Sequence, residues 1–178
     1  MTAALPGRTA NLLGAVALAL RDRMVEAISD RPGHSESAAA ALSALDQFLV
    51  RPSIDRLSQV VGLSQSGAVR LVDQLEDDGL VRRSPGADGR TTAVSLTPAG
   101  RRAARRVERS RLQLLDATLQ PLSAAEREAL AALLARLLAD MMREPGATRW
   151  MCRLCDLSAC GRAAGDCPVE REAQARYG

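Results

Sequence analysis

The sequence is poor in aromatic residues and contains no lysine. Among its 178 residues there is one phenylalanine, one tryptophan and one tyrosine, which together make up 2% of the chain. A core without aromatic side chains is built from leucine, valine and alanine, which favours packed helices over a β-sandwich. The same scarcity argues against a protein that binds single-stranded nucleic acid by stacking bases on aromatic rings.

Long uncharged stretches and histidine are also scarce. A membrane-spanning helix needs about 18 or more apolar residues, whereas the apolar stretch 12–20 is short and runs into three charged residues. We therefore expect no transmembrane segment, no signal peptide and a cytoplasmic location. The single histidine, His34, lies beside a glycine in a predicted loop. No catalytic triad or phosphate-binding glycine loop is recognisable, so we expect no enzyme.

The positive charge is concentrated in one part of the chain. Residues 82–111 contain nine arginines against Asp88 and Glu108, a net charge of +7, so that the rest of the chain carries −4 within a total of +3. A basic segment of this kind suggests a polyanionic partner. A solvated helix face would have the same composition, so the charge alone does not decide between the two.

The periodicity of apolar residues predicts a mainly helical fold. The expected helices are residues 12–30, 35–50, 54–61, 64–78, 98–120 and 123–143. Five of them begin after a Ser or Thr that can cap a helix: Ser35, Ser53, Ser64, Thr97 and Ser123. The expected buried residues include Leu42, Leu45, Phe48 and Leu49 in the second helix and Val69, Val72 and Leu75 in the fourth.

A helix-turn-helix with a wing is predicted in the middle of the chain. Gly62-Leu63-Ser64 joins two short helices through a tight turn, which is typical of a helix-turn-helix but also of an ordinary helical hairpin. Next comes a predicted β-hairpin, with strands at 80–83 and 90–96 around a turn cluster at 84–89. Thr92, Val94 and Leu96 alternate on one side of its second strand. A hairpin directly after the second helix indicates a winged helix-turn-helix.

The second helix of the pair and the wing supply candidate DNA-binding residues. The helix begins with Ser64, Gln65 and Ser66, followed one turn later by Arg70. Gln can bond adenine bidentately and Arg can do the same with guanine in the major groove. The wing adds Arg82, Arg83 and Arg90, and an arginine is attracted into a narrow minor groove. Asp88 either fixes the shape of the wing, by pairing with Arg90 or the backbone, or is an incidental turn residue.

Over residues 38–104 the sequence resembles the MarR family of bacterial winged-helix transcription regulators. The segments that carry the resemblance are Gly62-Leu63-Ser64, Val69-Arg70, Asp78-Gly79-Leu80-Val81-Arg82-Arg83, Asp88-Gly89-Arg90 and Leu96-Thr97-Pro98-Ala99-Gly100-Arg101. The resemblance implies a homodimer that binds pseudo-palindromic double-stranded DNA, usually as a repressor, with Arg90 in the minor groove. It also implies that helices near both ends form the dimer interface, and a small-molecule effector pocket is common in the family.

The expected architecture is mainly α with a small β-wing. It divides into an N-terminal dimerisation helix (1–34), the winged helix-turn-helix (35–98), C-terminal dimerisation helices (99–145) and a cysteine-rich tail (146–178). The apolar stripe of the helix at 123–143 fits a dimer seam, although an intramolecular core helix would carry the same pattern.

The tail contains every cysteine of the protein. Cys152, Cys155, Cys160 and Cys167 follow the spacing C-x2-C-x4-C-x6-C. Four thiolates can complete a tetrahedral zinc site, and the spacing resembles a zinc knuckle with Cys in place of its usual His. An iron–sulfur cluster, a switch of free thiols and four incidental cysteines are the alternatives. Zinc is preferred because the residues between the ligands are few and small or polar.

Two functions follow from these patterns. The first is a dimeric DNA-binding regulator in which a metal or redox signal at the tail changes the spacing of the recognition helices. The alternative is a metal- or redox-responsive adaptor that uses its helices for protein contacts and whose winged helix does not bind DNA.

Overall fold

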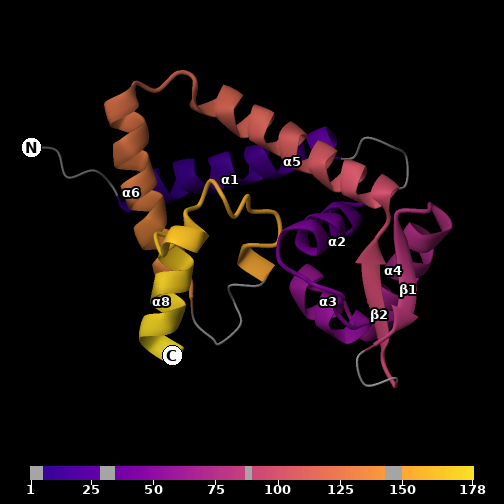
Figure 1. The fold of residues 1–178 in the computed structure, drawn as a ribbon. Helices are drawn as coiled ribbons and strands as arrows, with labels where there is room; N and C mark the ends of the chain where they lie inside the picture. Colours follow the sequence, from indigo (N-terminus) through magenta and orange to yellow (C-terminus); the bar gives the residue numbers. More distant parts are fainter. Residues whose placement is uncertain (1–5, 29–34, 87–89, 143–149) are drawn as a thin grey trace, which may run out of the picture.

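The computed structural model describes residues 6–28, 35–86, 90–142 and 150–178, which form helices and one small β-hairpin at one end of the molecule (Figure 1). This confirms the predicted fold class. The elements in chain order are α1 (Pro6–Ile28), α2 (Glu36–Gln47), α3 (Ile54–Val61), α4 (Gln65–Asp77), β1 (Val81–Pro85), β2 (Thr92–Leu96), α5 (Pro98–Leu119), α6 (Ala124–Asp140), the short 3₁₀ helix η1 (Arg162–Ala164) and α8 (Pro168–Tyr177).

Side-chain caps fix the starts of five helices where the sequence predicts them. Ser35, Ser53, Ser64, Thr97 and Ser123 each accept a hydrogen bond from a backbone N–H three residues further along. At α6 the Glu126 carboxylate also accepts from the Ser123 backbone N–H, which completes the predicted capping box. Each cap satisfies an N–H that the helix itself leaves unpaired, so these boundaries are set locally.

Helix α2 lies at the centre of the core and buries mostly alanines. Its buried residues are Ala38, Ala39, Ala40, Ala41, Leu42, Ser43 and Ala44. Of the four large residues predicted for this core, only Leu42 is fully buried, whereas Leu45, Phe48 and Leu49 are half-buried. That part of the prediction holds only in part, since Leu45 and Leu49 pack against the core but stay half-buried. Helix α2 contacts α1, α3, α4, α5 and β2, and its small side chains let these neighbours approach closely.

The wing is a two-stranded antiparallel hairpin in which Val81 pairs with Leu96 and Pro85 with Thr92. Val94 and Leu96 are buried as predicted, but Thr92 is exposed and Ala93 is buried instead. The strict alternation fails because β2 also pairs with the segment before α3. There Ala93 forms a bridge with Ser53, and the Val94 backbone N–H donates to the Pro52 carbonyl at 2.9 Å. This third strand-like segment pairs with the edge of β2 that does not face β1.

Helix α4 buries Ala68, Leu71, Val72 and Leu75. Val69, which the sequence predicts to be buried, is 37% exposed. Val69 is exposed because of the helical period: residues 68, 71, 72 and 75 lie on the face that packs against the core, and residue 69 lies beside that face.

The long helices α1 and α6 and the C-terminal segment lie at the end of the molecule opposite the wing. Figure 1 shows α1 and α5 running along each other, with α6 turning away from the end of α5 and α8 packed beside α6. Helix α8 is not predicted from the sequence, and α1 begins earlier than the predicted residue 12. No helix in the described part of the chain is long and apolar enough to cross a membrane. His34 lies outside the described residues.

Candidate nucleic-acid interface and cysteine cluster

The turn between α3 and α4 has the geometry of a helix-turn-helix. Gly62 ends α3 in the left-handed conformation, with φ of 70°, which only glycine adopts without strain. Ser64 then caps α4 by accepting from the Gly67 N–H at 3.2 Å. The predicted contact residues Ser64, Gln65, Ser66 and Arg70 are all exposed. The first turns of α4 therefore present polar side chains to solvent.

The start of α4 and the wing border the same surface hollow. Its lining residues are Ser53, Ile54, Asp55, Gln65, Thr91 and Thr92. Gln65 comes from the first turn of α4, whereas Thr91 directly follows Arg90 in the wing. Two predicted DNA-contacting parts that are separate in sequence thus lie next to each other.

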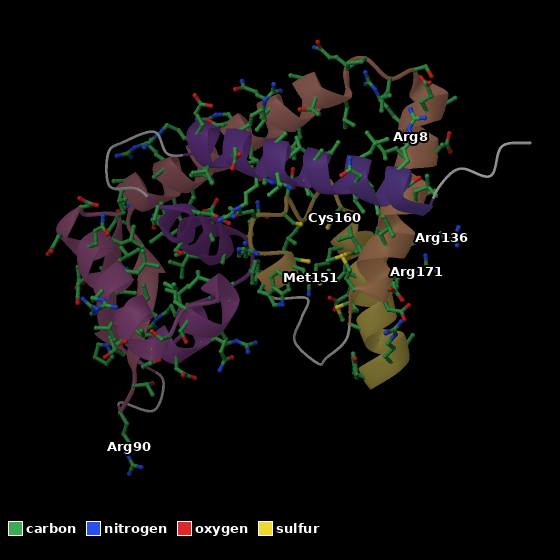
Figure 2. All side chains as sticks on the ribbon, turned by 180° about the vertical axis from the view of Figure 1, so that it is seen from behind. Arg8, Arg90, Arg136, Met151, Cys160 and Arg171 are labelled. Carbon is green, nitrogen blue, oxygen red and sulfur yellow. The ribbon has the colours of Figure 1, made fainter. Side chains whose placement is uncertain are left out.

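Arg90 lies at the tip of the wing, and Figure 2 shows its side chain projecting away from the ribbon. It is exposed. Asp88, the predicted wing acid, lies outside the described residues, so its proposed pairing with Arg90 stays a prediction.

The two arginines of β1 have different surroundings. Arg83 binds two acids of α4, with its guanidinium 2.5 Å from the Glu76 carboxylate and 2.6 Å from the Asp73 carboxylate. Its backbone N–H also donates to Glu76 at 2.8 Å. The backbone amide and guanidinium of Arg83 together hold the pKa of Glu76 below its ordinary value of 4.5. Arg82 is more exposed and donates to the Ser95 hydroxyl across the hairpin. Arg83 thus joins the wing to α4.

Arg51, in the turn between α2 and α3, contacts the wing, and this contact is not predicted from the sequence. It has a left-handed backbone, with φ of 46°, which is uncommon for a residue other than glycine. Its guanidinium donates to the Ser84 hydroxyl at 3.2 Å and to the Pro85 carbonyl at 2.9 Å. Arg51 therefore fixes the end of β1 relative to the end of α2. The only sequence signal is its place before Pro52, which favours a turn without naming a partner.

Two apolar helix faces remain uncovered in the single chain. On α6, Leu133, Leu134, Leu137 and Leu138 are 38–56% exposed, and none of its residues is buried. On α1, Leu12, Leu13, Val16 and Leu18 are 51–65% exposed. The alternative prediction, that the apolar stripe of α6 belongs to the core of a single chain, is therefore wrong for the described residues. Two large apolar faces of this kind mark an interaction surface.

The concave regions near α2 differ in size. A small pocket of about 20 Å³ between α1, α2 and α5 is only large enough for one water molecule. An open groove of about 650 Å³ separates α2 from the wing and falls in the size range of ligand sites. Four arginines line this groove: Arg51, Arg82, Arg83 and Arg101.

The C-terminal loop gathers all four cysteines into one small core with Met142 and Val169. Cys152 and Cys167 are buried, whereas Cys155 and Cys160 are half-buried. The turn that joins the last two cysteines uses glycines with φ of 68° at Gly161 and 80° at Gly165. A backbone hydrogen bond of 3.0 Å from the Asp166 N–H to the Gly161 carbonyl closes it. These turns bring Cys167 back to the cluster that contains the other three cysteines.

The four thiols lie close enough to shift one another's pKa values. Cys152 interacts with Cys155, which raises the pKa of Cys152. The same hydrogen bond, helped by Arg111 and Arg162, lowers the pKa of Cys155 to about 6. Burial and the neighbouring Cys167 raise the pKa of Cys160.

The four soft donors suit zinc or an iron–sulfur cluster in chemistry and number. In the described ranges, however, no three His, Cys, Asp or Glu side chains are arranged to hold one metal ion. The donor set therefore fits such a group in kind and number, and the thiols would have to rearrange to bind a single ion.

Comparison with known proteins places this geometry among transcription regulators. The chain is 33% identical over 86 residues to YwhA of Bacillus subtilis, an uncharacterised helix-turn-helix type transcriptional regulator. The match covers 48% of this chain and 62% of that protein, so it spans less than two thirds of the relative's length. No family model matches the chain.

Solved structures extend the likeness to most of the chain. A MarR family protein from Bacillus stearothermophilus is 25% identical and superposes with a TM-score of 0.66, covering 79% of this chain and all of that one. A MarR family transcriptional regulator from Silicibacter pomeroyi is 29% identical with a TM-score of 0.59, covering 79% and 93%. The chain thus has the winged-helix fold of MarR-type regulators. The relatives are described as transcription regulators and not as enzymes.

Proposed function

We propose that the protein is a MarR-type transcriptional regulator that binds a pseudo-palindromic DNA operator as a homodimer and represses transcription. The observation that carries this proposal is the common hollow bordered by Gln65 of α4 and Thr91 beside Arg90. In a winged helix the first turns of the recognition helix read bases in the major groove while the wing contacts the adjacent minor groove. The exposed polar residues of α4 and the wing tip supply the groups for both contacts.

Salt dependence of DNA binding tests the proposal. A duplex selected by the protein from a randomised library serves as the operator, and a scrambled duplex of equal length is the control. Each neutralised phosphate releases counterions, so the operator affinity should fall steeply as salt rises. We expect the selected duplex to be preferred by at least about 10³-fold at one salt concentration. Weak binding without sequence preference would instead support the protein-interaction adaptor.

We propose that the exposed faces of α1 and α6 form the homodimer interface. Both faces expose large apolar side chains, and a second copy of the chain would remove them from water. The groove between α2 and the wing suits a small anionic effector, because its four arginines surround a volume of ligand size. Chemical-shift or fluorescence titration with small aromatic and aliphatic carboxylates would identify such an effector.

We further propose that Cys152, Cys155, Cys160 and Cys167 hold a zinc ion that cross-links the C-terminal loop. Support comes from the four soft donors in one small core. Elemental analysis and a visible spectrum of protein purified without oxygen test this. One zinc per chain without colour supports the proposal, whereas iron with a brown chromophore supports an iron–sulfur cluster. Protein without metal supports a thiol switch.

A further inference from the structure

The cysteine segment, residues 150–167, lies directly against the DNA-binding half of the molecule. Figure 1 shows the orange loop between the α6–α8 pair and α2, and Figure 2 shows Met151 and Cys160 from behind in the same place. The contact is therefore with the helix that carries the core of the winged helix. This placement is not predicted from the sequence.

Two polar contacts join the segment to α2, one at each end of the helix. At its start the Arg153 guanidinium lies 3.1 Å from the Glu36 carboxylate, and both side chains are largely shielded, with 26% and 32% exposed. At its end the Leu157 backbone N–H donates to the Gln47 side-chain carbonyl at 3.4 Å. The Gln47 amide in turn donates to Glu108 of α5 at 2.7 Å.

Leu154 adds an apolar contact between these two polar ones. It packs against the main core, which includes α2, α3 and α4, and also against the small cluster formed by Ile28, Ala39 and Val107. Leu154 and Arg153 lie between Cys152 and Cys155 in the chain. Any change that moves these two sulfurs therefore moves the residues that contact α2.

We propose that the cysteine segment braces α2, so that a chemical change at the four thiols alters operator affinity through Arg153, Leu154 and Leu157. The consequence for DNA rests on the proposed function, whereas the bracing of α2 does not. Helix α2 contacts α3, α4 and β2, so a shift in α2 changes how the recognition helix and wing are held. A chemical change at the thiols thus reaches the DNA-binding surface through α2, and not only through the proposed dimer interface.

A double-mutant cycle with Cys155→Ser and Glu36→Gln tests this coupling. Cys155→Ser changes the thiol cluster, and Glu36→Gln removes the charge that Arg153 contacts without changing the size of the side chain. Independent substitutions combine additively to within about twofold in affinity. We expect the double variant to differ from the product of the single effects by more than about threefold. The readout is affinity for the selected duplex, measured by fluorescence anisotropy with the full chain.

Asp46→Asn is the matched control. It removes a carboxylate from the same helix, but Asp46 is exposed and lines the groove beside the wing rather than the cysteine segment. Its cycle with Cys155→Ser should be additive. Additive behaviour in both cycles would overturn the proposal, and so would equal non-additivity in both.

Amide hydrogen exchange separates failure of the coupling from failure of the proposed function. If no duplex is selected, the proposed function is wrong, and the bracing of α2 is judged by exchange alone. We expect Cys155→Ser to raise exchange in residues 36–47 severalfold, and by less when Glu36→Gln is already present. Unchanged exchange contradicts the brace. If Cys155→Ser does not fold, Cys160→Ser replaces it in both measurements, because Cys160 is also half-buried.

Discussion

At the scale of single residues, arginines that look alike in the sequence have different roles. Arg83 and Arg90 are seven positions apart in the basic segment, and both are predicted DNA contacts. In the folded chain Arg83 pairs with Asp73 and Glu76, whereas Arg90 extends from the wing tip. Arg90 is exposed, whereas Arg83 is half-buried against α4. The contribution to DNA binding should therefore come more from Arg90 than from Arg83, because a phosphate can reach the exposed guanidinium more easily.

Arg90→Ala should weaken operator binding by roughly tenfold or more without lowering thermal stability, because a groove contact by arginine is worth about 1–3 kcal/mol. Fluorescence anisotropy and thermal unfolding provide the two measurements. Arg136→Ala is the control, since Arg136 is an exposed arginine on α6, away from the wing (Figure 2). Equal affinity of the Arg90 variant and wild type would remove the wing from the interface.

Glu76→Gln should lower the melting temperature at neutral pH by weakening the link between α4 and the wing. The pKa of Glu76 is lowered from 4.5 in the folded chain, so the charged carboxylate stabilises the fold. This stabilisation is fully present above pH 4.5 and is lost as the pH falls through the lowered folded pKa. Melting curves of both proteins from pH 7 to pH 3 should converge at the acidic end. A constant difference over this range would contradict the assignment.

At the scale of elements, a close approach of backbones fixes α5 against the wing. The Thr97 hydroxyl donates to the Gly79 carbonyl at 2.7 Å and caps α5. Gly100 sits so close to the start of β1 that an added Cβ would lie 1.9 Å from the Leu80 carbonyl oxygen. The long helix is thereby held rigidly to the hairpin, so that a movement of α5 reaches the wing.

Gly100→Ala should destabilise the protein by about 1–3 kcal/mol, because the methyl group overlaps a backbone atom that cannot rotate away. Gly14→Ala is the matched control, since an added Cβ there meets no atom within 4 Å. In a helix interior this control should be neutral or stabilise the chain by up to about 1 kcal/mol. Urea unfolding measures both variants. A Gly100 variant as stable as wild type would show that β1 and α5 separate readily.

At the scale of the whole molecule, the exposed faces of α1 and α6 make a single chain incomplete. Neither face has a partner in the described chain that would remove it from water, whereas most large apolar residues of the winged helix, such as Leu57, Val72 and Leu75, are buried. Burial of apolar surface contributes about 25 cal/mol per Å². A dimer that covers these leucines therefore gains substantial stability.

Leu134→Glu should convert the proposed dimer to monomer, because a carboxylate would have to enter the proposed apolar seam without a partner. Sedimentation equilibrium measures the mass of the particle. Val50→Glu is the control, since Val50 is 90% exposed and lies in the turn after α2. That variant should retain the wild-type mass. A Leu134 variant that remains dimeric would move the interface away from α6.

Local signals were sufficient for the starts of the five capped helices and for the order of elements from α2 to α6. Each cap residue acts within three positions of itself, so the sequence alone predicts Ser35, Ser53, Ser64, Thr97 and Ser123. Local patterns were insufficient where another segment intervened. Ala93 is buried and Thr92 is exposed because Ser53 pairs with β2 at Ala93. In α2 mainly alanines are buried, rather than the predicted larger residues, because several elements pack closely against this helix. Helix α8 was missed because its apolar pattern is short and it packs only against α6 and the thiol core.

The sequence by itself determined the winged helix-turn-helix, the exposed polar residues at the start of α4 and the clustering of four cysteines in one segment, because these follow from spacing and local hydrogen bonds. Only the tertiary structure decided which arginines are paired, which apolar faces remain exposed and where the cysteine loop docks. Those outcomes depend on contacts between residues far apart in the chain, such as Arg153 with Glu36. Periodicity carries no information about such partners, since it specifies only the face on which a side chain lies.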